Sequence, residues 1–187
     1  MRKRAGQGNR RFDWIRLVYE DFEHHTPVVR LQDKIIPMDQ LPVWREARRE
    51  EGKTIVVTNG CFDLLHAGHV TYLAEAASHG DILLVGVNDD AGVKELKGDS
   101  RPLNQEQDRA LVLAALESVG ATCIFHGSTA TEFLKLAEPD VYVKGGDYTV
   151  ETLNAEERSV VQAAGGKFVF IPFLEGRSTT SIVSKMK

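Results

Sequence analysis

The segment Thr54–His69, TIVVTNGCFDLLHAGH, decides how the rest of the chain is interpreted. Its first five residues are apolar or β-branched, and such a run favours a strand buried in a sheet. Gly60 and Gly68 follow, and glycine lets the backbone turn and approach a ligand closely. An amphipathic helix is expected over His66–His79, at the end of this turn. The segment therefore predicts a strand, a glycine-flanked turn and the N-terminus of a helix.

The same alternation of apolar strands and amphipathic helices continues along the chain. Strands are expected over Thr54–Thr58, Ile82–Val87, Thr122–Phe125, Val141–Val143 and Lys167–Ile171. Helices are expected over His66–His79, Asn104–Val119 (with an Asn-x-x-Gln cap), Ala130–Ala137, Glu151–Ala164 and Ser178–Met186. Because parallel strands need helical crossovers, this pattern predicts an α/β fold: a Rossmann-like, doubly wound parallel sheet with helices on both faces. In such sheets ligands bind beyond the carboxyl ends of the strands.

Three regions are expected along the chain. Residues 1–12 contain five basic side chains and no acid, which predicts a basic, disordered tail, with a nucleic-acid-binding arm as the alternative. Residues 13–52 are expected to form a helical N-terminal extension in which Leu41, Trp44 and Ala47 share one face. Residues 53–187 then form the main α/β domain.

Composition and charge narrow the class of protein. Hydrophobic residues make up 42% of the chain and charged residues 27%, as in ordinary globular proteins. The formal net charge of −4 argues against a surface built for nucleic acid. No apolar run is long enough for a membrane helix, and no secretory signal follows the basic N-terminus. Cys61 and Cys123 form no Cys-x-x-Cys motif and are expected to be buried thiols in a reducing cytoplasm.

The histidines of the first turn are the leading catalytic candidates. His66 and His69 lie three residues apart, so both imidazoles are expected on the same side of the first helical turn. A helix N-terminus supplies unpaired N–H groups and a positive dipole end, which suit phosphate. Two alternatives remain open: a zinc site with Asp63 as a third ligand, or two unrelated surface histidines.

Two lysines and an arginine are candidate phosphate ligands. Lys94 and Lys97 are expected in a polar loop after the second strand, where an ammonium group can neutralise a phosphate. Arg109 lies near the start of the following helix beside Asp108, and a structural ion pair fits it as well as a phosphate contact. For both lysines the alternative is a solvated charged loop.

Two further turns follow later strands. Lys144–Asp147, KGGD, follows a buried strand, and its paired glycines suggest backbone that lies against a nucleotide. Asp147 is expected to accept a hydrogen bond from the ribose or base, or only to cap the turn. Ser178, Thr179 and Thr180, preceded by Arg177, offer hydroxyl and N–H groups to phosphates, although one serine would satisfy a plain N-cap.

These motifs resemble a known family. Asn59–Asp63, NGCFD, with His66–His69, HAGH, is similar to the nucleotide-binding signature of the cytidylyltransferase-like nucleotidyltransferases, and Gly176–Ser181, GRSTTS, resembles their second signature. More narrowly, Leu96–Gly98, Arg101–Pro102, Asp108–Arg109, Lys144–Tyr148 and Pro172–Thr180 resemble the adenylyltransferase subfamily of ADP-heptose synthesis. The resemblance covers roughly residues 34–187 and makes residues 53–187 a nucleotidyltransferase domain.

The resemblance implies an adenylyl transfer from ATP, with Mg²⁺, to a sugar 1-phosphate such as heptose 1-phosphate, which yields an ADP-sugar and pyrophosphate. The implied catalytic residues are His66, His69 and Lys97. The implied nucleotide-binding residues are Asn59, Gly60, Cys61, Phe62, Asp63, Gly68, Asn88, Gly145, Asp147, Arg177, Ser178, Thr179 and Thr180. The acceptor phosphate is assigned to Lys94, Lys97, Arg109 and Lys144, and no metal ligand set is expected from the protein alone.

The expected setting is cytoplasmic, in carbohydrate metabolism and lipopolysaccharide synthesis. A homodimer is expected, as is a separate sugar kinase in the same pathway, with neither nucleic acid nor membrane as partner. Alternatives remain: a cytidylyltransferase for glycerol 3-phosphate or a similar small phosphate, a cofactor-precursor adenylyltransferase, a non-catalytic nucleotide sensor, or a nucleic-acid-binding protein led by the basic tail.

Overall fold

The computed structural model describes residues 30–146, 148–172 and 179–184, and the described residues from Leu31 onward belong to one compact unit. The expected tail over residues 1–12 and the first part of the expected extension, residues 13–29, lie outside the described residues.

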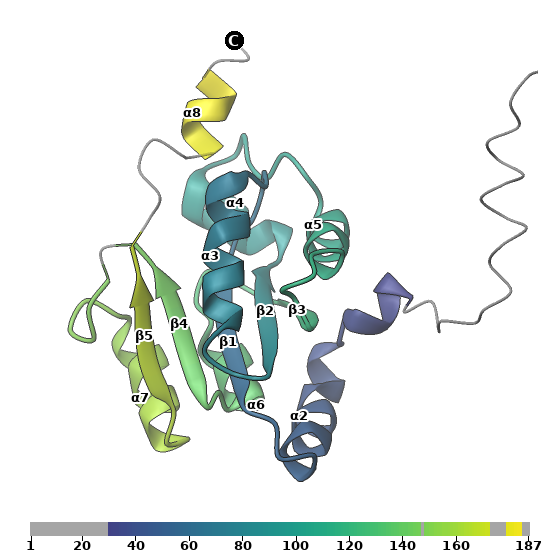
Figure 1. Cartoon of the computed structure of the whole chain (residues 1–187). Coiled ribbons are helices and arrows are strands. Elements are labelled where there is room, and N and C mark those ends of the chain that lie inside the picture. The colour runs from purple at the N-terminus through teal and green to yellow at the C-terminus, as the bar shows by residue number, and fades with distance from the viewer. Residues whose placement is uncertain (1–29, 147, 173–178, 185–187) are drawn as a thin grey trace, which may run out of the picture. The chain divides into compact units, whose positions relative to one another are not determined.

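Five parallel strands form the central sheet in the order β3-β2-β1-β4-β5 (Figure 1). They are β1 (Ile55–Gly60), β2 (Ile82–Asn88), β3 (Ala121–Phe125), β4 (Val141–Gly145) and β5 (Lys167–Ile171). The aliphatic residues of β1 alternate between two cores, because successive side chains of a strand point to opposite faces: Ile55 and Val57 join one, and Val56 the other. All five predicted strands are confirmed, with ends that differ by at most two residues.

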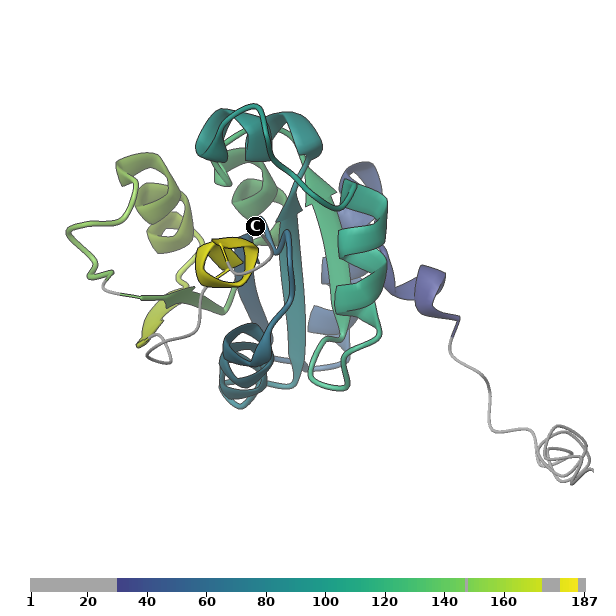
Figure 2. The ribbon, with the colours of Figure 1, turned by 90° about the horizontal axis from the view of Figure 1, so that it is seen from above.

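Helices cover both faces of the sheet (Figure 2). On one face, α3 (Ala67–Ala77) and α5 (Glu106–Ala114) bury Leu73 and Leu113 in one core. On the other, α6 (Thr131–Ala137) and α7 (Ala155–Ala163) bury apolar side chains such as Phe133 in the second core. Strand order reverses direction between β1 and β4, so the doubly wound prediction is confirmed. The last described helix is α8 (Thr179–Ser184).

Residues 31–52 pack against the edge of the sheet and against α6. They form two 3₁₀ helices, η1 (Leu31–Lys34) and η2 (Met38–Gln40), and the helix α2 (Leu41–Glu50). The backbone N–H of Ile36 donates to the Thr122 carbonyl at 2.8 Å, and Leu41 is fully buried. Arg45, also buried, donates to the carbonyls of Ala137 and Glu138, where a cation complements the C-terminus of α6. A domain boundary at residue 52 stays a prediction.

Two local predictions are wrong. Lys94 and Lys97 do not lie in a loop but in the helix α4 (Asp90–Lys97), because the Asp89 carboxylate caps it by accepting the Gly92 N–H at 2.7 Å, and Val93 is fully buried. The Asn-x-x-Gln cap is not used either. Helix α5 begins at Glu106, and the side chain of Asn104 instead donates to the carbonyl of Asp63 at 2.7 Å.

Candidate active site

A cavity of about 530 Å³ opens beyond the carboxyl ends of the strands, next to the point where strand order reverses. The sequence-predicted residues that line it come from the carboxyl ends of β1, β2 and β4 and from the segments that follow β1, β2 and β5. They are Asn59, Gly60, Cys61, Phe62, His66, Gly68, His69, Asn88, Lys97, Lys144, Gly145 and Thr179. The structure thus brings together most of the described candidates, as expected for an open α/β sheet.

The two histidines of the first turn lie side by side at the start of α3. Their rings stack with centroids 3.9 Å apart, and the Phe62 ring meets His69 edge-on at 5.5 Å. The carbonyl of His66 accepts the first helical hydrogen bonds from the N–H groups of His69 and Val70. The prediction that both imidazoles lie on the same side of the first turn is confirmed.

His69 is held in its neutral form near neutral pH. Burial, together with the nearby His66 and Lys97, lowers the pKa of its imidazole from 6.5 to about 4. A neutral imidazole can donate a hydrogen bond to a phosphate oxygen but carries no charge of its own. Among the described residues that line the cavity, Lys97 brings a positive charge to this side.

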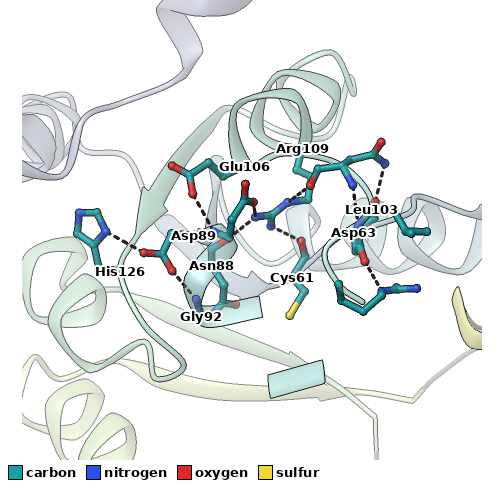
Figure 3. Close-up of polar contacts among 12 residues, drawn as sticks. Cys61, Asp63, Asn88, Asp89, Gly92, Leu103, Glu106, Arg109 and His126 are labelled. Atoms are coloured by element: carbon teal, nitrogen blue, oxygen red, sulfur yellow. Dashed lines mark hydrogen bonds and ion pairs between the residues drawn. The ribbon is translucent and has the colours of Figure 1, made fainter. Parts of the chain in front are cut away.

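Lys97 and Lys94, both on α4, have different surroundings. Lys97 lines the cavity, whereas Lys94 forms an exposed ion pair of 3.2 Å with Asp99 and does not reach it. The helix is held at its start by Asp89, which accepts from the N–H of Gly127 at 3.2 Å. Asp89 also contacts Nδ1 of His126 at 2.9 Å (Figure 3). The position of Lys97 therefore depends on contacts at the opposite end of α4.

Asp63 anchors a loop and does not line the cavity. Its side chain is fully buried, forms an ion pair of 2.5 Å with Arg101, and accepts the N–H of Leu103 at 2.6 Å and of Asn104 at 3.2 Å (Figure 3). These contacts tie the loop before α5 to the first turn. They favour a structural role over nucleotide or zinc binding for this carboxylate.

The side chain of Arg109 likewise bonds to other groups of the protein. It is 2% exposed, and its guanidinium donates to the carbonyls of Cys61 at 2.6 Å and Asn88 at 2.7 Å and pairs with Asp90 at 2.8 Å (Figure 3). This geometry favours the structural ion pair over a phosphate contact, with Asp90 rather than the neighbouring Asp108 as its partner. Cys61 itself is a buried thiol whose pKa is raised by burial, which leaves it protonated at neutral pH.

A buried polar network surrounds Lys144. Its ammonium group donates to Oδ1 of Asn59 at 2.8 Å and lies 3.5 Å from a carboxylate oxygen of Glu157. The Tyr142 hydroxyl lies 2.7 Å from the same Asn59 oxygen and 3.0 Å from Glu157. Burial lowers the pKa of Lys144, and the Glu157 carboxylate opposes that shift.

The last helix also reaches the first turn. The hydroxyl of Thr179 lies 3.4 Å from the carbonyl of Leu64, and Thr179 lines the cavity. Asp147, Arg177 and Ser178, as well as the side chain of Thr180, lie outside the described part of the chain. Within the part that is described, no three His, Cys, Asp or Glu side chains gather into a possible metal site. No helix within those same residues is long and apolar enough to cross a membrane.

A glycine-flanked turn at a strand-to-helix junction agrees with the comparison to known families. The model of the family described as cytidylyltransferase-like matches residues 57–184. The chain belongs to the cytidylyltransferase-like family.

Within this family, several curated relatives carry the name bifunctional protein HldE. The chain is 43% identical to the protein from Syntrophotalea carbinolica over 90% of its own length and 34% of the relative. It is 47% identical to the one from Geobacter metallireducens, over 82% of this chain and 31% of the relative. The chain thus spans about a third of the length of these relatives.

Two solved structures share the fold. A lipopolysaccharide core biosynthesis protein from Thermoplasma volcanium has a TM-score of 0.55 and 25% identity, covering 67% of this chain and all of that chain. A pantoate-beta-alanine ligase from Francisella tularensis, solved in complex with beta-gamma ATP and beta-alanine, has a TM-score of 0.53 and 15% identity over 80% of this chain and 76% of its own. The second likeness concerns the fold alone.

Eight residues that line the cavity were not predicted as site residues from the sequence. They are Tyr72, Leu96, Ser128, Thr129, Tyr148, Leu153, Asn154 and Glu157. Ser128 and Thr129 follow the carboxyl end of β3, so the rule that ligands bind beyond strand ends could have found them. Glu157 carries no such signal, because it stands among charged residues on an amphipathic helix.

Proposed function

We propose that this chain transfers the adenylyl group of ATP to a sugar 1-phosphate, with heptose 1-phosphate as the acceptor, and releases pyrophosphate. Family membership, the relatives named HldE and the resemblance to the ADP-heptose adenylyltransferases support this proposal. The observation that carries it is the cavity that joins the His66–His69 turn, Lys97 and Thr179 at one edge of the sheet.

The proposed reaction is a direct in-line displacement. An oxygen of the acceptor phosphate forms a bond with the α-phosphorus of ATP, and the bond from that phosphorus to the bridging oxygen of pyrophosphate breaks. The attacking oxygen is already anionic near neutral pH, since a second phosphate pKa is about 6, so no general base is required. Catalysis then consists of positioning and charge stabilisation.

The residues of the cavity have different roles in this reaction. His66 and His69 donate hydrogen bonds to oxygens of the α-phosphate and of the leaving group, at a helix N-terminus that favours negative charge. Lys97 neutralises the acceptor phosphate or the α-phosphate. Thr179 binds the phosphate tail, together with Arg177, Ser178 and Thr180 as the sequence predicts, and Asn59 and Gly145 contact the nucleotide.

Mg²⁺ is proposed to enter with ATP and to share the charge of the phosphates. The ion is proposed to be held mostly by the phosphates and water, as is usual for Mg²⁺ bound with a nucleotide. No step is assigned to a metal ligand of the protein.

One partner activity follows from this reaction. The acceptor must carry a phosphate at its anomeric carbon, so a sugar kinase activity has to supply it. A homodimer stays a prediction, which sedimentation of the purified chain would decide.

A pyrophosphate-release assay tests the proposed function. ATP and CTP would each be combined with heptose 1-phosphate, glycerol 3-phosphate and phosphopantetheine. Release with ATP and heptose 1-phosphate, at least tenfold above every other pair, is expected. Release with CTP and glycerol 3-phosphate instead would establish the cytidylyltransferase alternative. Binding of ATP without pyrophosphate release for any acceptor would favour a nucleotide sensor.

A further inference from the structure

One wall of the cavity is polar, buried and without net charge. It is formed by Lys144 at the end of β4 and Glu157 on α7, whose side chains are 13% and 7% exposed and lie 3.5 Å apart. Both line the cavity. Burying a lysine and a glutamate costs solvation energy that their attraction rarely returns, so such a pair is weak evidence for a role in stability. A role in binding explains why it lies on a cavity wall.

The network around this pair is held rigidly. The second carboxylate oxygen of Glu157 accepts the N–H of Ala130 at 2.8 Å, which ties α7 to the start of α6. Tyr142 and Lys144 both contact Oδ1 of Asn59, which sets the orientation of its amide. The ammonium group of Lys144 also lies 5.2 Å from the centre of the Tyr142 ring. The groups that face a ligand here are therefore fixed before it binds.

The charge of this wall differs from that of the histidine side. Lys97 brings a cation to His66 and His69, next to the N-terminus of α3, and this side suits phosphate. The charge of Lys144 is instead balanced by Glu157, so it attracts a phosphate much less than a lysine without a partner would. Fixed donors and acceptors without net charge are what a sugar hydroxyl needs, because it both donates and accepts hydrogen bonds.

We propose that Lys144 and Glu157 bind hydroxyl groups of the acceptor sugar and determine its specificity, so Lys144 does not hold the acceptor phosphate. In this role Glu157 accepts a hydrogen bond from a hydroxyl and Lys144 donates one. The inference rests on the proposed function, because it assigns the wall to the acceptor and leaves the nucleotide to the turn after β1.

Neighbouring residues extend the same wall. Thr129 lines the cavity from the loop before α6, and Asn154 lines it from the N-cap of α7. The hydroxyl of Ser128 donates to Glu95 at 2.9 Å, which joins this loop to α4. Thr129 thus offers a hydroxyl from an exposed loop position, where its removal leaves the core intact.

The test compares Glu157→Gln with Glu156→Gln, the exposed glutamate that precedes it on the same helix. Steady-state kinetics with ATP and heptose 1-phosphate would give KM for each substrate. In Glu157→Gln we expect KM for heptose 1-phosphate to rise about tenfold or more, the loss typical of a hydrogen bond to a charged group. In the same variant, KM for ATP should stay within about twofold of its value in the unchanged protein. Both KM values in Glu156→Gln should equal those of the unchanged protein. A larger rise in KM for ATP than for the sugar, or no change in either, overturns the inference.

A second variant, Thr129→Val, tests the inference even if Glu157→Gln fails to fold. Thr129→Val keeps the shape of the side chain and removes only the hydroxyl, and it should raise KM for heptose 1-phosphate about fivefold without lowering the midpoint of thermal unfolding. If Glu157→Gln does not fold and KM for heptose 1-phosphate is unchanged in Thr129→Val, the inference is overturned as well.

Calorimetry separates this inference from the proposed function, because it requires no turnover. The unchanged protein should bind heptose 1-phosphate more tightly than inorganic phosphate, and Glu157→Gln should lose most of that difference. Equal affinity of the unchanged protein for both ligands overturns the inference even if pyrophosphate is released. Absence of pyrophosphate release with normal discrimination between the two ligands rejects only the proposed function.

Discussion

Gly92 in α4 packs directly against the backbone of Gly127, so closely that a Cβ on Gly92 would collide with the Gly127 carbonyl group. A methyl group at this position must push α4 away from the loop after β3, and Lys97 moves with the helix. We expect Gly92→Ala to lower stability by about 1–3 kcal/mol, as overpacking does, and to reduce kcat. Urea unfolding and the pyrophosphate assay would measure both. Ala91→Ser, on the exposed side of the same helix, should change neither.

Removal of the His69 imidazole tests the role of the first turn. Loss of one preorganised donor to a charge that develops in the transition state costs about 2.7–4 kcal/mol, or roughly a hundredfold or more in kcat. We expect that loss in His69→Ala. The matched control is His79→Ala, which alters an exposed histidine just after α3. Near-normal turnover in His69→Ala would exclude the assigned role.

The parallel sheet can be predicted from the sequence because each strand is a short, nearly continuous apolar run between polar turns. Ile82–Val87 illustrates this, since β2 covers the same residues and extends by one. Helix α4 escapes prediction, because DAGVKELK has too few apolar residues to show a period. What makes it a helix is the Asp89 cap and the burial of Val93, and both depend on the tertiary fold.

Some features of the candidate site can likewise be predicted from the sequence, and others cannot. The spacing of His66 and His69 places them together, because a helical turn brings residues three apart onto one side. The role of Arg109 cannot be derived from its neighbours along the chain, since three of its partners lie 19 or more residues away. Asp63 and Glu157 are similar cases, in which a charged side chain acquires its function from elements that only folding brings close.

The lowered pKa of His69 predicts a dependence of stability on pH. Its pKa is about 4 in the folded protein against 6.5 as the reference value, so between these two pH values the unfolded chain binds a proton that the folded chain does not. Falling pH therefore favours unfolding, and the contribution of this group to stability is fully present above pH 6.5. We expect His69→Asn to lose less stability than the unchanged protein between pH 7 and pH 5, as measured by urea unfolding at each pH. An equal loss in both proteins would contradict the neutral state of His69.

The two lysines of α4 form an internal comparison. Lys97 lines the cavity, so Lys97→Ala should lower kcat/KM by about a hundredfold, as expected for a lost charge contact to the reacting phosphates. Lys94 takes part only in an exposed ion pair with Asp99. Exposed pairs contribute little, and Lys94→Ala should change kcat/KM by about twofold or less. A large effect of Lys94→Ala would restore it as a phosphate ligand and would require α4 to rearrange on binding.

Because Asp63 pairs with Arg101 and does not line the cavity, the variant Asp63→Asn should lower the free energy of unfolding without removing a group that contacts the substrates. Asp63→Asn leaves the mostly buried guanidinium without a counter-charge, and removal of one partner of a buried pair costs about 3–5 kcal/mol. Urea unfolding would measure this loss. Replacement of both partners, as Asp63→Asn with Arg101→Met, removes the uncompensated charge, so the double variant should regain part of the stability. If Asp63 instead bound the nucleotide, Asp63→Asn would keep its stability and raise KM for ATP.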